Sequence, residues 1–386
     1  MGNVANTRVK YSSSNIQAFF LLVRAGLFRC TEGADTLLRC NMDWDKVYQL
    51  AVEQCVVGLL TEGIEALRNE MPGKDFSRLL QQSRSLRLEA KTLYLEQRNV
   101  AMNQFVAKLI NGMQRRDIRT LLLKGQGVAQ CYEKPLWRTC GDVDLLVWSK
   151  HYQKAKEQLL PFASCYGDEH AYKKHYAMVI GPWMLELHGS LRCGFSARVD
   201  RELDIICNEA FSDGNVTTWT VEGVEVPMLG QENNVLYVFV HFLNHFYKGG
   251  VGIRQVCDWC RLLWSYRDRL NLSALEMRLK KMGLLSEWRA FGAYAVEYLG
   301  MPVEAMPFYS DDVRWKRKAR RIQRFILMTG NMGNNRKKPQ GNVSIQARKL
   351  MAVLQRIGDL AHHLTIFPLD TLRFLPRIFL TGLQQK

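Results

Sequence analysis

The sequence contains no apolar run long enough to cross a lipid bilayer. Its longest apolar stretch near the N-terminus, residues 18–28, is interrupted by Arg24 and falls short of the roughly 20 residues that a membrane-spanning helix needs. Residues 1–14 are polar and show no signal-peptide pattern, and Asn6 stands where N-myristoylation requires Ser or Thr. We therefore expect a cytoplasmic protein without a transmembrane segment.

Repeated metal-binding motifs are absent from the ten cysteines. Cys257 and Cys260 form one CxxC inside a segment that we predict to be helical, but no second CxxC or His-x-His lies at zinc-finger spacing. Zinc and redox sites are the alternatives for such a pair. In a chain without a secretory signal we expect reduced thiols, and for this pair buried ones.

Acidic residues are scarce in the C-terminal part. Residues 313–386 hold sixteen Lys and Arg but only Asp359 and Asp370, a net charge of +14, which leaves +2 of the total +16 for the first 312 residues. An anionic partner should therefore meet this end: RNA, or an anionic membrane surface on which the protein would be peripheral. Packing of the amphipathic segment 343–364 against the protein itself is the alternative.

Two acids begin a predicted strand in the segment Gly141-Asp-Val-Asp-Leu-Leu-Val. Because side chains alternate along a strand, Asp142 and Asp144 project from the same face. Two close carboxylates repel each other and raise each other's pKa unless a cation lies between them. The pair therefore indicates a hard metal such as Mg²⁺, bound by carboxylates and substrate phosphates; a solvated strand end is the alternative.

A glycine turn suited to phosphate precedes the acidic strand. Residues 120–123 predict a buried strand, Lys124 and Gly125 follow it, and a short helix is predicted from Gly127. Backbone N–H groups at a helix start and a lysine ammonium both attract anions. The segment therefore predicts a phosphate-binding turn.

A third carboxylate follows the acidic strand. Residues 176–191 predict a hairpin that turns at Gly181-Pro182, and its second strand presents Glu186 and His188 on one face. We expect Glu186 to lie beside Asp144 on an adjacent strand. Three carboxylates on neighbouring strands suit a two-metal phosphoryl or nucleotidyl transfer centre.

Together these segments resemble an uncharacterised bacterial nucleotidyltransferase-like family of the polymerase-β-type nucleotidyltransferase superfamily. The likeness covers roughly residues 40–265, and the matching elements are Trp44-Asp45, Leu123-Lys124-Gly125, Arg138 with the segment Gly141–Val147, Glu186-Leu187-His188, His241-x-x-x-His245 and Arg254-x-x-x-Asp258. Considered by their spacing alone, His241 and His245 share a helix face. A structural or substrate-facing role and a metal-binding pair are both open for them. Arg254 and Asp258 have the spacing of a helix-surface ion pair.

The resemblance implies an enzyme that uses Mg²⁺, or Mn²⁺, to move a nucleoside monophosphate from an NTP, ATP first, to an unidentified acceptor, which is a small molecule, a protein or RNA. The implied catalytic and metal-binding residues are Asp142, Asp144 and Glu186. The implied nucleotide-binding residues are Lys124, Gly125, Arg138 and His188, with Arg138 neutralising charge on the leaving pyrophosphate.

A second hypothesis is a catalytically inactive module that kept the fold and acts as a nucleotide sensor or docking protein. In the wider superfamily the phosphate turn has Gly-Ser or Gly-Gly, whereas Gln126 follows Gly125 here. No motif identifies an acceptor. Nucleotide binding without pyrophosphate release would favour this hypothesis.

The order of patterns along the chain predicts an α+β protein, with a small mixed β-sheet nucleotidyltransferase core flanked by helices. Helical periodicity predicts helices over residues 15–28, 44–67 and 75–114, and a second hairpin is predicted over 217–228. The expected parts are an N-terminal helical region (1–116), the α/β core (117–228), a helical domain (229–330), and a basic loop, amphipathic helix and tail (331–386).

Overall fold

The computed structural model describes residues 11–39, 41–71, 85–170, 172, 174–336 and 344–383. The described chain divides into two compact units. The sheet unit comprises Ala90–His241 and Asp258–Leu285. The helical unit comprises the described residues up to Glu89, Phe242–Cys257, and those from Ser286 onward.

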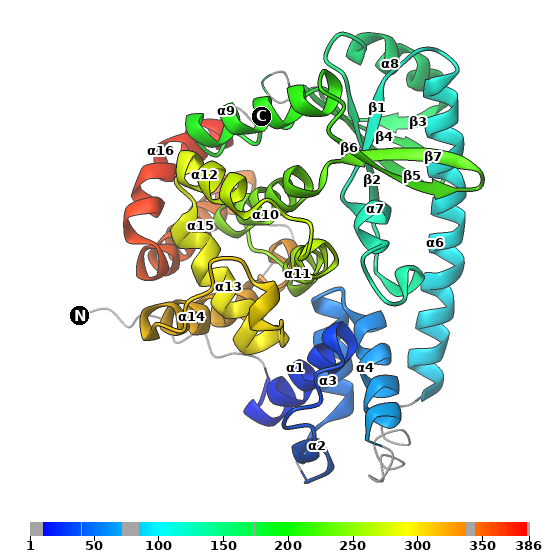
Figure 1. The fold of residues 1–386 in the computed structure, drawn as a ribbon. Helices are drawn as coiled ribbons and strands as arrows, with labels where there is room; N and C mark the ends of the chain where they lie inside the picture. Colours follow the sequence, from blue (N-terminus) through cyan, green and yellow to red (C-terminus); the bar gives the residue numbers. More distant parts are fainter. Residues whose placement is uncertain are drawn as a thin grey trace. The chain divides into compact units, whose positions relative to one another are not determined.

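A mixed β-sheet forms the centre of the sheet unit (Figure 1). Its strands are β1 (Thr120–Leu123), β2 (Asp142–Val147), β3 (Ala163–Tyr166), β4 (His175–Ile180), β5 (Trp183–His188), β6 (Val216–Val221) and β7 (Val224–Leu229). Their spatial order is β3-β4-β5-β2-β1-β7-β6. The pairs β2–β5 and β1–β7 are parallel, and the other pairs are antiparallel. Both predicted hairpins and the predicted α+β class are confirmed.

Helices complete the sheet unit. They are α7 (Gly125–Ala129), α8 (Tyr152–Leu159), α9 (Ala197–Phe211), α12 (Leu272–Met282), the short turns η1 (Pro135–Trp137) and η2 (Leu160–Phe162), and parts of α6 (Ser85–Gln114), α10 (Gln231–Lys248) and α11 (Ile253–Tyr266). Helix α6 is most of the helix predicted from residue 75, and residues 75–84 of that prediction lie outside the described part.

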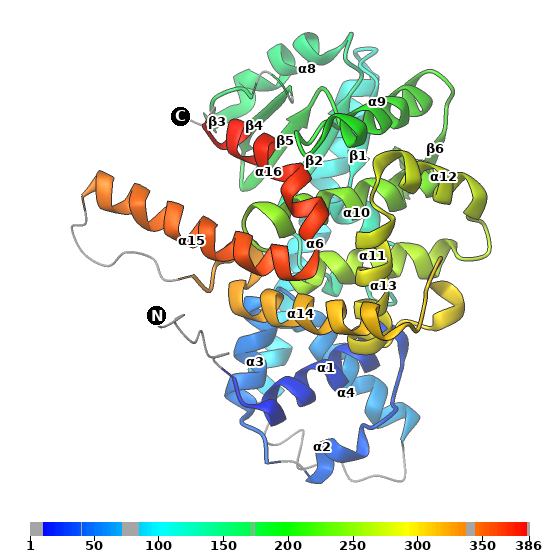
Figure 2. The same cartoon turned by 90° about the vertical axis from the view of Figure 1, so that its left-hand side faces the viewer.

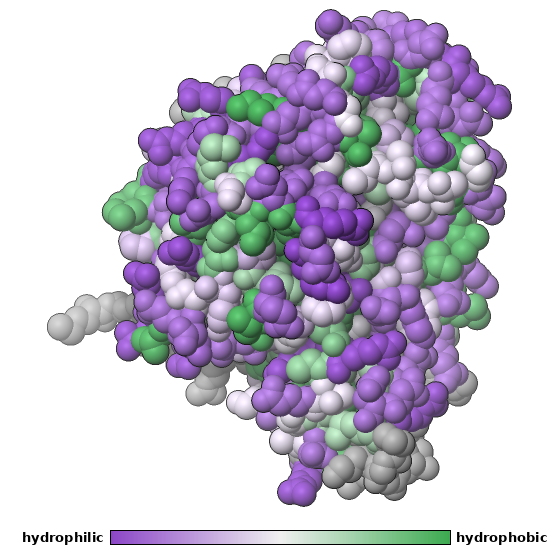
Figure 3. All heavy atoms as spheres, viewed as in Figure 1, coloured by the Kyte–Doolittle hydropathy of each residue, from purple (hydrophilic) through white to green (hydrophobic). Residues whose placement is uncertain are grey.

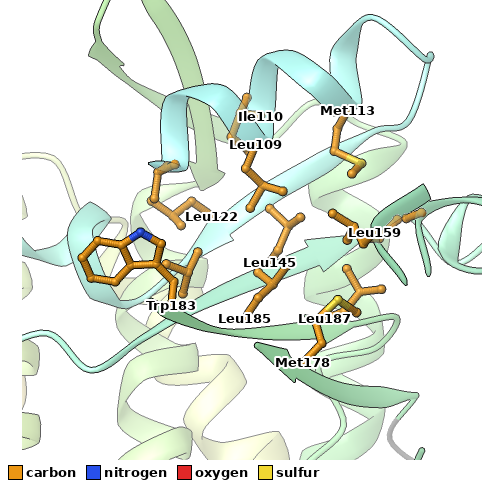
Figure 4. Close-up of a cluster of buried hydrophobic side chains, with 14 of the residues drawn as sticks. Leu109, Ile110, Met113, Leu122, Leu145, Leu159, Met178, Trp183, Leu185 and Leu187 are labelled. Carbon is orange, nitrogen blue, oxygen red and sulfur yellow. The ribbon is translucent and has the colours of Figure 1, made fainter. Parts of the chain in front are cut away.

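One face of the sheet carries the hydrophobic core. Figure 4 shows side chains of α6, among them Ile110 and Met113, beside Leu145 of β2 and Leu187 of β5. These residues are at most 3% exposed. Since strand side chains alternate, burial of Leu145 and Leu187 turns their sequence neighbours to the opposite face. The apolar face thus determines where the polar residues of β2 and β5 lie.

The helical unit contains α1 (Ser13–Phe28), α2 (Asp35–Arg39), α3 (Trp44–Glu53), α4 (Val57–Glu70), α13 (Leu285–Leu299), η4 (Val303–Ala305), α14 (Val313–Thr329), η5 (Asn331–Gly333), α15 (Ile345–Ile366) and α16 (Pro368–Leu383). Helices α1 and α4 pack closely where Gly26 faces Gly63. A Cβ atom on Gly26 would overlap the Leu59 carbonyl oxygen, and one on Gly63 would overlap that of Leu22.

The prediction of one continuous helix over residues 44–67 is wrong, because two helices occupy this range. Asp43 caps α3, accepting a hydrogen bond from the Lys46 N–H at 3.2 Å, but the helix ends at Glu53. Cys55 then adopts a left-handed φ of 57° before α4 begins. The break places the buried Gln54 so that its Oε1 accepts a 2.9 Å hydrogen bond from the Ile253 N–H. The apolar periodicity of residues 44–67 could not predict this contact, because it involves a residue far away in the sequence.

The C-terminal helices contribute to the core of the helical unit. Figure 2 shows α16 following α15 after the break at Phe367-Pro368. Phe367 and Phe374 are fully buried, and their ring centroids lie 6.3 and 5.4 Å from that of Tyr247. Phe367 and Phe374 of the C-terminal part therefore pack within the protein. Of the predicted basic loop, residues 337–343 lie outside the described part.

Exposed large hydrophobic side chains are present among the described residues, for example Phe162 and Leu369. On the face shown in Figure 3, hydrophilic residues prevail and hydrophobic ones form small separate patches. In the part of the chain that the structure describes, no helix combines the length and the apolar character that a membrane span requires.

Candidate active site

A group of polar side chains lies on the sheet face opposite the core. In the parallel pair β2–β5, Asp144 is the register partner of Glu186, and Leu146 is that of His188. Asp142 is two residues before Asp144 on the same strand. The expectation that Glu186 lies beside Asp144 on an adjacent strand is confirmed.

Lys124 and His188 both contact one oxygen of Asp144. The Lys124 Nζ and the His188 Nε2 each lie 2.9 Å from the Asp144 Oδ1. The Asp144 side chain is only 3% exposed. The ammonium group of Lys124 therefore compensates the negative charge of Asp144.

Glu186 is held by two histidines. Its Oε2 lies 3.1 Å from the His175 Nε2 and 3.6 Å from the His188 Nε2. Burial alone would raise the pKa of Glu186, but the hydrogen bonds from His175 and His188 and the charge of Lys124 outweigh it and hold that pKa well below its usual range. Burial would lower the pKa of His188, but its hydrogen bonds to Asp144 and Glu186 raise it above the usual value.

A sharp turn after β1 directs Lys124 toward Asp144. Lys124 and Gly125 have φ values of 51° and 44°, in the left-handed region that a lysine rarely adopts. The predicted short helix is present as α7 and begins at Gly125. Burial would lower the pKa of Lys124, but the charge of Asp144 leads to a net increase. The His241 Nε2 of α10 lies 3.3 Å from the Lys124 Nζ.

Gln126 and Gly127 have structural roles in this turn. The Gln126 side chain is buried, and its Nε2 donates a 3.1 Å hydrogen bond to the Asn99 Oδ1 of α6. A Cβ atom on Gly127 would overlap the Met228 sulfur of β7. Gln126, which stands where the wider superfamily has Ser or Gly, therefore links the turn to α6 through its hydrogen bond to Asn99.

Arg138 forms a buried ion pair with Asp258. Its Nε and Nη2 donate to the two carboxylate oxygens of Asp258, both at 2.7 Å. The Tyr132 hydroxyl donates to the same carboxylate at 2.8 Å. Asp258 is therefore a partner of Arg138, a contact that the sequence spacing did not indicate. The bidentate pair fixes the segment before β2 to α11.

His175 is a site residue that the sequence analysis missed. The β4–β5 hairpin pairs Ile180 with Trp183, and the same register places His175 opposite His188. The two imidazole centroids are 4.8 Å apart. Counting back from the predicted Gly181-Pro182 turn would have found His175. Tyr237 of α10 is also buried near Lys124, Asp144 and Glu186, and burial chiefly raises its pKa; no sequence signal marks it.

The donor set suits a divalent cation. Asp142, Asp144 and Glu186 offer the carboxylate oxygens that Mg²⁺ prefers. His175, Glu186 and His188 each offer one ligand atom, and these three atoms lie within 4.8 Å of one another. A carboxylate–histidine group able to hold a metal ion is therefore present, without an identity for the ion.

Cys257 and Cys260 are fully buried, which confirms the expectation for their thiols. Burial raises the pKa of the Cys260 thiol far above its usual value. Among the described residues, the groups of three or more potential metal ligands do not include this pair.

A comparison with protein families agrees with the geometry. A family model described as uncharacterised nucleotidyltransferase matches residues 41–300. Among solved structures, the chain is similar to an antigenic nucleotidyltransferase-like protein from Paracoccidioides brasiliensis, at 14% identity and a TM-score of 0.30, over 48% of this chain and 90% of that one. No curated protein matches the chain.

Proposed function

Because the chain belongs to the uncharacterised nucleotidyltransferase family, we propose that it is a Mg²⁺-dependent enzyme that moves a nucleoside monophosphate from an NTP to an acceptor. ATP is the first donor to test. The observation that carries the proposal is the register of β2 with β5, which brings Asp144 beside Glu186, with Asp142 on the same strand. In this proposal the three carboxylates hold the metal.

In this proposal the residues around the carboxylates bind the phosphates and the nucleotide. A bound Mg²⁺ would supply positive charge close to the phosphates. Lys124 exchanges Asp144 for a phosphate oxygen when the nucleotide enters, and the backbone at Gly125 lines the same turn. A depressed pKa makes Glu186 a weak base and a good metal ligand. His188, whose pKa is raised by its hydrogen bonds to Asp144 and Glu186, faces the nucleotide.

Arg138 has a different role in this proposal from the one that the resemblance implied. Its guanidinium is buried and paired with Asp258, so a charge on pyrophosphate would have to compete with a bidentate carboxylate. We therefore assign Arg138 to positioning the segment before β2, and Lys124 to the phosphates.

The test uses NTPs labelled at the α-phosphate, Mg²⁺ and a cell extract as acceptor pool. Wild type should move label to one fraction and release pyrophosphate. Asp142→Asn should lower the rate by roughly 100-fold or more, because one charge of the site is lost. The exposed Asp213 provides the control variant Asp213→Asn, which should match wild type.

Thermal melts with and without Mg²⁺–ATP complete the test. Wild type should gain stability from the ligand, and Asp142→Asn should not. Asp142→Asn is the better variant because Asp144→Asn would leave Lys124 and His188 without their shared carboxylate oxygen. If wild type gains no stability from any Mg²⁺–NTP, and transfers no label, the proposed activity is wrong.

A second candidate is an inactive module that senses a nucleotide or acts as a docking protein. The contacts of Lys124 and His188 with the Asp144 Oδ1 favour it, since they already compensate that carboxylate without a metal. Saturable Mg²⁺–NTP binding without pyrophosphate release from any acceptor pool would identify this function.

The basic C-terminal part is the proposed contact with an anionic partner, RNA or a membrane surface, for a cytoplasmic protein that would then be peripheral at the membrane. Helix α14 contributes exposed arginines to it, namely Arg314, Arg317, Arg320, Arg321 and Arg324. Sedimentation with phosphatidylserine vesicles and gel shift with RNA distinguish the two partners.

A further inference from the structure

Three potential ligands of a softer metal come together on one hairpin. In the antiparallel pair β4–β5, His175 is the register partner of His188, and Ala177 is that of Glu186. The side chains of Glu186 and His188 share a face because they are two residues apart on β5. The three ligands therefore lie on two hydrogen-bonded strands, a rigid support for a metal site.

Two separations between the donor atoms are close to those in a coordination shell, and all three atoms lie within 4.8 Å of one another. The Glu186 Oε2 lies 3.1 Å from the His175 Nε2 and 3.6 Å from the His188 Nε2. With Zn–N and Zn–O bonds of roughly 2.1 Å at tetrahedral angles, neighbouring ligand atoms are about 3.4 Å apart. The observed separations lie on either side of that value. Both rings already direct a nitrogen toward the same oxygen, so a metal could bind with little rearrangement.

The ligand types discriminate between metals. Mg²⁺ prefers oxygen ligands in an octahedral shell, whereas imidazole nitrogens suit Zn²⁺ and other first-row transition metals. The side chains of His175 and Glu186 are 29% and 28% exposed, so an ion from solution can reach them. The Asp144 Oδ1, 2.9 Å from the His188 Nε2, is a candidate fourth ligand.

We propose that His175, Glu186 and His188 form a binding site for a transition-metal ion, Zn²⁺ in the first instance, next to the carboxylate pair of β2. The site shares Glu186, His188 and the candidate ligand Asp144 with the proposed function, but metal binding itself does not require nucleotidyl transfer. Glu186 would then contact both metals, as a shared carboxylate does in two-metal centres. The protein would bind one transition metal in the absence of nucleotide.

The test measures metal binding directly, on full-length protein stripped with a chelator. Equilibrium dialysis against Zn²⁺ followed by metal analysis should give one equivalent per chain. Titration with Co²⁺ should give the visible absorption of a tetrahedral ion. Mg²⁺ in large excess should not displace the Zn²⁺. His175→Gln and His188→Gln should each weaken Zn²⁺ binding by at least about tenfold.

Two further variants make the result specific. His362→Gln replaces an exposed histidine of the helical unit and should bind Zn²⁺ like wild type. Asp142→Asn should keep the Zn²⁺ equivalent while losing nucleotidyl transfer, so failure of the transfer assay leaves the metal proposal standing. If His188→Gln does not fold, His175→Gln decides, since Zn²⁺ should raise the melting temperature of wild type but not of this variant.

Either of two results would overturn the proposal. One is the lack of a stoichiometric Zn²⁺ or Co²⁺ equivalent in wild type. The other is unchanged Zn²⁺ affinity in a folded His175→Gln variant, which would show that the two histidines serve only as hydrogen-bond partners of Glu186.

Discussion

At the scale of single residues, Arg138 and Asp258 form a buried ion pair in well-defined geometry. Arg138 is 5% exposed and Asp258 also 5%, and they share two hydrogen bonds of 2.7 Å. Arg192 and Asp204 form a pair of similar length, but with side chains 41% and 37% exposed. Burial, and not distance, distinguishes the two pairs.

Asp258→Asn should destabilise the protein far more than Asp204→Asn. Removal of one partner from the buried pair leaves Arg138 without its counter-charge and should cost about 3–5 kcal/mol of unfolding free energy. The exposed pair should contribute about 0–1 kcal/mol. Urea denaturation of both variants, with wild type alongside, provides the measurement. Equal losses would contradict the assignment of Arg138 to positioning.

Glu287 of α13 is a buried carboxyl group with one satisfied oxygen. Its Oε1 accepts a 3.1 Å hydrogen bond from the Tyr247 hydroxyl, and its Oε2 has no hydrogen-bond partner among the described residues. Burial, reinforced by the charge of Asp370, raises the pKa of Glu287 from 4.5 to about 8. The nearby Lys318 opposes this increase.

The pH dependence of stability follows from this shift. Between pH 4.5 and about 8 the folded protein keeps a proton that the unfolded chain releases, so unfolding free energy should fall as pH rises through that window. Glu287→Gln keeps the shape without the titration. It should flatten the slope and be the more stable protein at pH 8, by roughly 1–3 kcal/mol.

Denaturation curves at pH 5 and pH 8 check this expectation. The exposed Glu304 supplies the control Glu304→Gln, which should keep the slope of wild type. Parallel pH profiles for wild type and Glu287→Gln would mean that Glu287 is ionised in the folded protein.

At the scale of elements, the crossing of α1 and α4 depends on two glycines. Gly26→Ala places a methyl group against the Leu59 carbonyl and should cost about 1–3 kcal/mol, because backbone atoms cannot move aside as a side chain can. Gly112→Ala is the control. Gly112 lies within α6, with only the Arg116 Nη1 near its added Cβ, at 3.9 Å. This control should stabilise α6 by roughly 0.5–1 kcal/mol. Thermal melts distinguish the two; a neutral Gly26→Ala would show that the helices can separate.

The strands of the site could be predicted, because strand parity is a local property. Alternation in β5 correctly placed Glu186 and His188 on one face, and the structure buries Leu185 and Leu187 on the other. The ion pair of Arg138 with Asp258 joins residues 120 positions apart. Such a contact depends on tertiary packing, and local spacing indicated only Arg254 as a partner of Asp258.

At the scale of the whole molecule, the C-terminal helices complete a core. Truncation after Met328 would remove Phe367 and Phe374, which contact Tyr247. We expect the shortened protein to aggregate or to lose a melting transition. Phe374→Ala should cost about 3–5 kcal/mol, whereas Leu369→Ala, at a residue 79% exposed, should be nearly neutral. A soluble truncated protein that merely loses binding to RNA or anionic vesicles would contradict this expectation.

The sequence pattern does not indicate which segments make up each of the two units. The four ranges expected from the sequence are consecutive, whereas each unit combines segments that are distant in the chain. Periodicity reports the local environment of a helix face and not which distant segment covers it. The division therefore becomes visible only in the tertiary contacts.

This interleaving separates the order of synthesis from the order of assembly. Helix α1 must bury Phe20 against Tyr298 of α13, but about 200 residues lie between the first segment of the helical unit and its last, which starts at Ser286. At roughly 5–20 residues per second, translation needs about 10–40 s to make them. The sheet unit, whose last residue is Leu285, is then complete on the ribosome while α1 still lacks its contact with α13. A nascent chain arrested in that interval would present to chaperones the side of α1 that Tyr298 later covers.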